Sequence, residues 1–151
     1  AEAATRATYS KGLLARTTNA TATSTTLSTG AAWADVPGAT ITFNTIAGRW
    51  YRLKVDLSGF FDTPITSPYP GSLAITDSVN NFFATKSIPI HRALDQFSAD
   101  VEYVWQSVGT GGNSMKARYM IAAGTAGFRV AGLAPSSTVP WLVMSVYDEG
   151  V

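Results

Sequence analysis

The hydrophobic and polar positions of residues 49–61 alternate with a period of two, the pattern of a strand with one buried and one solvated face. The first set, expected to face a core, is Tyr51, Leu53, Val55, Leu57 and Phe61. The second set, expected to face solvent, is Trp50, Arg52, Lys54, Asp56 and Ser58. Charged or hydroxyl residues at nearly every second position exclude a strand buried on both faces. The pattern therefore predicts an antiparallel sheet.

The same alternation recurs along the chain, most clearly in residues 39–46, 97–107 and 115–123. About nine or ten extended segments follow one another at spacings of about 8 to 15 residues, and no helical period of useful length interrupts them. The pattern predicts an all-β fold, an antiparallel two-sheet sandwich. An eight-stranded jelly roll is the favoured topology.

Short connections between these segments predict tight turns. Ala47-Gly48 is expected to close a hairpin between residues 39–46 and 49–61, because so short a connection normally joins antiparallel neighbours. Asn80-Asn81 tolerates a positive φ and predicts a second tight turn. Residues 109–114, GTGGNS, are expected to form a flexible hairpin tip.

Prolines mark two places where a central strand is not expected. Residues 62–71, DTPITSPYPG, contain three prolines and predict a surface loop. Pro89 predicts that its strand lies at the edge of a sheet or ends there.

A chain of 151 residues suits one domain, which would bury roughly 70% of the surface exposed by the unfolded chain. Residues 1–18 are predicted to form an extended N-terminal arm or linker that ends in a possible first strand at residues 12–17. Residues 19–151 are predicted to form a single β-sandwich domain. The threonine-rich run that follows the arm has few large apolar groups and adds little core.

Charge and cysteine content restrict the kinds of partner. Eleven Lys and Arg residues oppose ten Asp and Glu residues, and the net charge is +1. These charges are scattered singly, so neither nucleic acid nor an anionic membrane is an expected partner. No apolar run approaches the roughly 18 residues of a membrane span. The absence of cysteine excludes disulfides, thiolate metal sites and cysteine nucleophiles.

No residue pattern in the sequence specifies a reaction. His91 is the single histidine, and one imidazole without a signature around it supplies neither a hydrolase triad nor a zinc site. Asp residues occur without a calcium-loop spacing, and Asp100 and Glu102 share the outer face of one segment. The glycines of residues 109–114 lack the lysine and helix of a phosphate loop. We therefore expect no enzyme activity and no cofactor.

Two aromatic residues are candidates for contact with a protein partner or a glycan. Trp50 falls on the polar side of its strand, and Tyr69 lies in the proline-rich segment. An exposed ring at either position would offer an apolar surface on which a sugar ring or a protein side chain can pack.

Three segments resemble, in the same order, the C-terminal β domain of minor tail proteins and other virion proteins of actinobacteriophages. They are EAATRATYSKGLLART, WADVPGATITFNTIAGRWYRLKV and PWLVMSVYDEG. The shared features include a glycine-arginine-aromatic-arginine step, here Gly48 to Arg52, and a proline, apolar strand and acidic-glycine ending, here Pro140 to Gly150. The family tends to end in Val-Glu-Asp-apolar-Gly, whereas this chain has Val146-Tyr147-Asp148-Glu149-Gly150.

The resemblance implies a non-enzymatic structural protein on the exterior of a virion, in a minor tail, fibre or capsid decoration component. Its partners would be other virion proteins. A homo-oligomer, with a trimer favoured, would order the poorly apolar N-terminal residues, and Tyr9, Leu13 and Leu14 are the candidates for subunit or virion docking. The alternative hypothesis is a receptor-recognition module that binds host-surface glycan through Trp50 or Tyr69.

Overall fold

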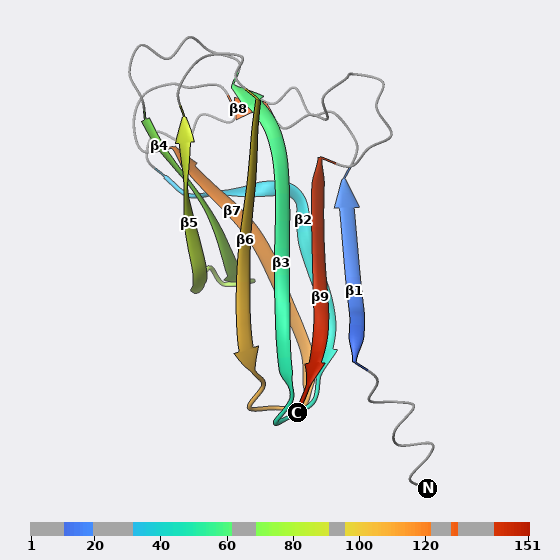
Figure 1. Ribbon diagram of the computed structural model, residues 1–151. Helices are drawn as coiled ribbons and strands as arrows, with labels where there is room; N and C mark the ends of the chain where they lie inside the picture. The colour runs from blue at the N-terminus through green and yellow to red at the C-terminus, as the bar shows by residue number, and fades with distance from the viewer. Residues whose placement is uncertain (1–10, 20–31, 62–68, 91–95, 122–127, 130–140) are drawn as a thin grey trace, which may run out of the picture.

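The computed structural model describes residues 11–19, 32–61, 69–90, 96–121, 128–129 and 141–151 (Figure 1). These residues form nine strands and no helix: β1 (Gly12–Asn19), β2 (Ala34–Thr45), β3 (Trp50–Phe61), β4 (Tyr69–Asp77), β5 (Phe82–Ile90), β6 (Gln96–Gln106), β7 (Gly111–Ile121), β8 (Phe128–Arg129) and β9 (Leu142–Gly150). The predicted all-β fold is confirmed. The division into an arm of residues 1–18 and a domain of residues 19–151 stays a prediction.

The strands form two antiparallel sheets that pack face to face (Figure 1). The first sheet has the order β1-β9-β3-β6, with the short β8 paired to the end of β3, and the second has the order β2-β7-β4-β5. The chain changes sheet at most connections, and the last long strand, β9, inserts between β1 and β3. This interleaving of two four-stranded orders is the jelly-roll topology that the strand spacing favours.

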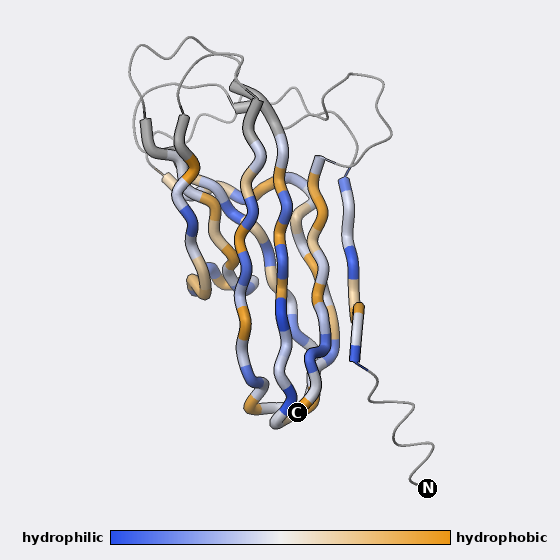
Figure 2. The backbone as a smooth tube through the Cα atoms, viewed as in Figure 1, coloured by the Kyte–Doolittle hydropathy of each residue, from blue (hydrophilic) through white to orange (hydrophobic). Residues whose placement is uncertain are grey.

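The core lies between the sheets and follows the alternation expected from the sequence. Along β3 the residues Tyr51, Leu53, Val55 and Leu57 are buried, while the residues between them are half-buried on the outer face. Figure 2 shows the same alternation of apolar and polar residues as colour along β3 and β6. The second sheet contributes Ile41, Phe43, Leu73, Ile75, Met115 and Ala117 to the same cluster. One continuous core therefore joins the two sheets.

The predicted hairpin between residues 39–46 and 49–61 is wrong. β2 pairs with β7 in the second sheet, whereas β3 pairs with β6 and β9 in the first. The backbone of the connection is bound from outside it, because Gly48 N donates to Ser107 O at 2.7 Å and Ala47 N to Thr110 Oγ1 at 3.0 Å. Hydrogen bonds from the β6–β7 connection thus replace those of a hairpin.

The predicted hairpin tip at residues 109–114 is corrected for the same reason. β6 belongs to the first sheet and β7 to the second, and β7 already begins at Gly111. By contrast, the tight turn at Asn80-Asn81 is confirmed, since it joins the neighbouring strands β4 and β5 and Asn80 has a φ of 74°.

The proline-rich segment is a loop only in part of the predicted range. Residues 62–68 lie outside the described residues, but β4 begins at Tyr69, and Pro70 lies opposite Pro89 of β5. Two prolines opposite each other fit a non-hydrogen-bonded pair, in which neither residue donates an N–H to its partner. The edge position predicted from Pro89 is confirmed, because β5 is the last strand of the second sheet.

The Pro37-Gly38 dipeptide produces a bulge within β2 rather than an end of the strand. The register of β2 against β7 shifts between Asp35 and Thr40, and Gly38 has a φ of 71°. The Asn19 side chain donates to Pro37 O at 3.3 Å, so the end of β1 is fastened to this bulge. A Cβ at position 38 would lie 2.8 Å from the Asn19 amide nitrogen, which favours glycine there.

Candidate functional site at the lower end of the sandwich

The β2–β3 and β6–β7 connections each cross from one sheet to the other, and we call them arches. They meet the C-terminal end of β9 at one end of the sandwich, at the bottom of Figure 1. We call this the lower end, and it consists of residues 46–49, 107–110 and 148–151. Ser107 N donates to Arg49 O at 2.9 Å, and Gly48 N donates to Ser107 O, so two backbone hydrogen bonds join the two arches. Side chains at this end are therefore held on a rigid base.

A buried ion pair between Arg49 and Asp148 lies under this end. Arg49 Nε donates to Asp148 Oδ2 at 2.9 Å and Arg49 Nη2 donates to Oδ1 at 2.9 Å, which is a two-pronged geometry. The backbone N–H of Gly150 also donates to Asp148 Oδ1, at 2.8 Å. The hydrogen bond to Asp148 raises the pKa of Arg49 above its ordinary value, so the guanidinium stays charged.

This pair joins two of the three segments in which the sequence resembles the virion proteins. Arg49 belongs to the glycine-arginine-aromatic-arginine step, and Asp148 belongs to the acidic-glycine ending. A second ion pair, Arg52 Nη2 to Glu149 Oε1 at 2.9 Å, lies above it on the outer face of the first sheet and is partly exposed. Both arginines of one motif thus bind an acid of the other motif.

An exposed row of residues crosses the outer face of the first sheet near this end. Leu13 lies opposite Tyr147, Tyr147 opposite Arg52, and Arg52 opposite Val104. Residues directly opposite each other in antiparallel strands project from the same face. Leu13 is 56% exposed and Val104 is 51% exposed. We call these four residues, together with the neighbouring Trp50, the outer row.

The two rows that follow on the same face are mostly charged or polar, with Val143 of β9 as an apolar member of the second. Arg16, Lys54 and Glu102 occupy the first of them, and Asp56 and Asp100 occupy the second. Lys54 binds Asp56 at 3.2 Å, and Asp100 binds Lys86 of β5 at 3.0 Å. The hydrogen bond and charge of Lys86 lower the pKa of Asp100 below its ordinary value. The outer row is thus a largely apolar band, in which Arg52 is the one charged member and is paired with Glu149, and charged and polar rows border it on one side.

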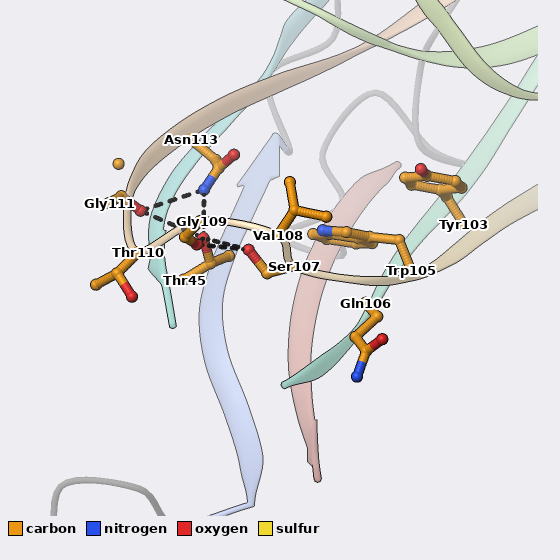
Figure 3. Close-up of a pocket in the computed structure, with 11 residues that line it drawn as sticks. Thr45, Tyr103, Trp105, Gln106, Ser107, Val108, Gly109, Thr110, Gly111 and Asn113 are labelled. Carbon is orange, nitrogen blue, oxygen red and sulfur yellow. Dashed lines mark hydrogen bonds between the residues drawn. The ribbon is translucent and has the colours of Figure 1, made fainter. Parts of the chain in front are cut away.

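A groove opens beside the lower end, between β6 and the start of β7 (Figure 3). Its volume is about 490 Å³, and its walls include Tyr103, Trp105, Val108 and Asn113. Figure 3 shows a hydrogen-bond network at one side of it, in which Ser107 Oγ donates to Thr45 Oγ1 at 3.1 Å and Asn113 Nδ2 donates to the same oxygen at 2.8 Å. The network fixes the loop that borders the groove.

The titratable residues that the structure describes are distributed over both sheets. No group of three or more His, Asp or Glu residues among them is placed to hold a metal ion. His91 lies outside the described residues. Among the carboxylates described above, Asp148, Glu149 and Asp100 are each bound to a cation. Within the described ranges, no helix has the length and apolar character needed to cross a lipid bilayer.

The structure brings together two of the residues selected from the sequence. Trp50, 44% exposed, and Leu13 lie on the same outer face, on β3 and β1, with only β9 between these strands. Leu14 is exposed at a bulge of β1. Tyr69 begins β4 at the opposite end of the sandwich, where its side chain is not described, and Tyr9 lies outside the described residues.

Sequence reasoning missed the Arg49–Asp148 pair and the groove. The two-residue alternation could have revealed the pair. Arg49 continues the inward-facing set of Tyr51 and Leu53, and Asp148 continues that of Met144 and Val146. A charged residue that continues an inward-facing set needs a buried partner of opposite charge. The groove depends on how two arches stack, which no local pattern specifies.

Comparison with known proteins gives no family assignment. No protein-family description matches the sequence, and no curated protein matches it. Among solved structures, an arabinose-bound α-L-arabinofuranosidase aligns with 90% of this chain at 13% identity and a TM-score of 0.43. The CBM22-1–GH10 modules of Clostridium thermocellum endo-1,4-β-D-xylanase 10B, complexed with xylohexaose, align with 93% of it at 11% identity and a TM-score of 0.40.

A viral structure, the infectious bursal disease virus VP2 subviral particle, aligns with 91% of this chain at 13% identity and a TM-score of 0.38. The chain spans 27%, 29% and 37% of the length of these three proteins, in the order given. Likenesses at this level carry no information about function.

Proposed function

We propose that the protein is a non-enzymatic structural component of a bacteriophage virion and acts through contacts with other virion proteins. The observation that carries the proposal is the outer row, a partly exposed and largely apolar band that runs across the first sheet from Leu13 to Val104 and whose one charged member, Arg52, is paired with Glu149. The sequence resemblance to actinobacteriophage virion proteins supplies the kind of particle. A location on the exterior of the tail or capsid follows from the same resemblance.

The outer row suits burial by a neighbouring protein. Adjacent strands lie about 4.8 Å apart, so a row across four strands is about 14 Å wide. Protein interfaces combine apolar and aromatic side chains with arginine at their core and have a polar rim, and the outer row has a similar composition. Trp50 and Tyr147 add aromatic side chains, which often supply much of the binding energy at such contacts.

The buried Arg49–Asp148 pair supports this role by fixing the surface above it. Arg49 precedes Trp50, and Asp148 follows Tyr147, so the ion pair holds two residues of the outer row in register. A preformed surface loses little conformational freedom on binding. In this proposal, the two motifs that resemble those of virion proteins act together to shape one contact face.

Replacement of outer-row residues by glutamate tests the proposal. Leu13→Glu and Trp50→Glu each place a charge in the apolar band, and both positions are exposed enough to keep the fold. We expect each variant to be at least tenfold depleted from purified phage particles, as measured by quantitative mass spectrometry. Thr85→Glu, on an exposed position of β5 in the second sheet, is the matched control and should be incorporated normally. Normal incorporation of both outer-row variants would contradict the proposed contact face.

The assembly that we propose is a homotrimer. Light scattering of the isolated chain should give three times the mass of 16.0 kDa. A folded chain that stays monomeric at every concentration would contradict the trimer but not attachment to other virion proteins.

A further inference from the structure

The groove between β6 and β7 has a chemical character that contact with virion proteins does not explain. Eleven residues line it, and none of them is charged: Thr45, Tyr103, Trp105, Gln106, Ser107, Val108, Gly109, Thr110, Gly111, Gly112 and Asn113. A second hollow of about 530 Å³ shares Gly112 and Asn113 with the groove and is lined by Thr, Phe, Asn, Ser and Gly residues alone. Two uncharged, mixed polar and apolar hollows therefore meet at one ridge.

The aromatic wall of the groove is fixed in place by ring stacking. The Tyr103 and Trp105 rings are stacked 5.0 Å apart, Phe83 of β5 stacks on Tyr103 at 5.0 Å, and Tyr51 packs on Trp105 at 5.6 Å. Stacking occupies the ring faces. A molecule in the groove would meet ring edges, which carry the polar atoms.

Those polar atoms are available for binding. Among the described residues, no hydrogen bond uses the indole N–H of Trp105 or the hydroxyl of Tyr103. Figure 3 shows both rings on one side of the groove and Asn113 on the other. The Asn113 amide nitrogen is already bound to Thr45 Oγ1, which fixes the amide and leaves its oxygen as an acceptor. The groove thus offers donors and an acceptor on rigid supports.

We infer that the groove binds a neutral, hydroxyl-rich ligand, a segment of an uncharged oligosaccharide. A phosphate, carboxylate or ammonium ligand would find no opposite charge in the lining, and a purely apolar ligand would leave the indole N–H and the amide oxygen unpaired. Sugar hydroxyls both donate and accept hydrogen bonds. The volume lies within the usual range for small-ligand sites, about 300 to 1,000 Å³. Residues 109, 111 and 112 are glycines, so no side chains at these positions obstruct the border of the groove. The ligand can therefore extend into the second hollow.

The experiment is an NMR titration of the ¹⁵N-labelled protein with neutral hexasaccharides of α-1,4-glucose, β-1,4-glucose, β-1,4-xylose and β-1,4-mannose, each up to about 10 mM. We expect at least one of them to shift the indole N–H signal of Trp105, which its loss in Trp105→Phe identifies. The shift should be insensitive to salt, because no charge takes part.

Two valine-to-arginine variants locate the site. Val108 is fully exposed at the rim of the groove, so Val108→Arg keeps the fold but places a long charged side chain at the entrance. We expect it to weaken binding at least tenfold. Val151→Arg, also at an exposed position but outside the groove, is the control and should bind as the wild type does.

Three results would overturn the inference. They are no shift with any of the four hexasaccharides, equal weakening by Val108→Arg and Val151→Arg, and tighter binding of an acidic oligosaccharide of galacturonate than of every neutral one. None of these results bears on the outer row, which lies on the opposite face of β6.

Discussion

At the scale of single residues, the chain depends on charges placed where apolar side chains would be expected. Arg49 and Asp148 both continue inward-facing sets, and they neutralise each other through three side-chain hydrogen bonds. A buried pair of this kind contributes little net stability compared with apolar residues, but the loss of one partner leaves an unpaired buried charge. The pair therefore specifies how the start of β3 fits against the C-terminal end of β9.

Loss of the Asp148 carboxylate should destabilise the fold strongly. We expect Asp148→Ala to lower the free energy of unfolding by about 3 to 5 kcal/mol, because the buried charge of Arg49 then loses the Asp148 carboxylate. The measurement is urea denaturation followed by circular dichroism. Glu149→Ala, which breaks the partly exposed pair with Arg52, is the neighbouring control and should cost less than about 1 kcal/mol. Similar losses in the two variants would contradict the distinct role of the buried pair.

The carboxylate of Asp35 should make stability depend on acid pH. Burial alone would raise the pKa of Asp35. Lys116 and Arg118 donate hydrogen bonds to its carboxylate and carry positive charges, and together these effects outweigh burial and lower the pKa below 3.8. Because the folded state has the lower pKa, the carboxylate stabilises the fold fully above pH 3.8, and this stabilisation is lost as the pH falls through the lowered value. Asp35 is about half exposed, so its contribution should stay below about 1 kcal/mol.

Asp35→Asn provides the test of that dependence. The difference in unfolding free energy between the wild type and this variant should be constant above about pH 5 and should shrink in more acid solution. A difference that grows as the pH falls would mean that the lysine and arginine do not hold the carboxylate in its ionised form.

At the scale of elements, the arches decide which strands pair. The β2–β3 connection is as short as a hairpin turn, yet it crosses between sheets because Ser107 and Thr110 bind its backbone. Gly48 makes the crossing with a φ of 81°. A residue with a side chain adopts this conformation only at a cost, even where there is space for a Cβ.

Alanine substitutions in the two arches should show whether the backbone conformation or the room for a Cβ is what requires glycine. Neither Gly48 nor Gly109 has an atom within 4 Å of an added Cβ, but only Gly48 has a positive φ. We expect Gly48→Ala to lower the free energy of unfolding by about 1 kcal/mol and Gly109→Ala to leave it unchanged or slightly raised. Thermal unfolding of both variants provides the measurement. Equal effects would show that the conformation of Gly48 is not what the arch requires.

Sequence reasoning succeeded where local pattern determines structure and failed where the stacking of sheets does. The alternation in residues 49–61 correctly identified the buried face of β3, and Pro89 correctly placed β5 at an edge. The pairing of β2 with β7 could not be predicted from the length of the β2–β3 connection. The backbone N–H groups of that connection donate to Ser107 and Thr110, which are distant in the sequence. For the candidate site, Trp50 and Leu13 were selected separately, and only the strand order β1-β9-β3 showed that they share a face.

At the scale of the whole molecule, the jelly roll separates two surfaces of different character. The outer row lies on the solvent face of the first sheet, while the groove lies where β6 and β7 leave the sandwich at its lower end (Figure 1, Figure 3). The proposed attachment to a particle and the proposed binding of a saccharide would therefore not compete on one copy. A protein in both complexes would present the groove outward while the outer row is covered.

The most direct test of the central claim, attachment to a virion through the outer row, is an image reconstruction of the intact phage particle at a resolution that places individual strands. The account predicts density for this jelly roll on the exterior of the tail or capsid, with Leu13, Trp50 and Val104 covered by a neighbouring protein. Absence of the chain from the particle, or a bound jelly roll whose outer row faces solvent, would contradict it.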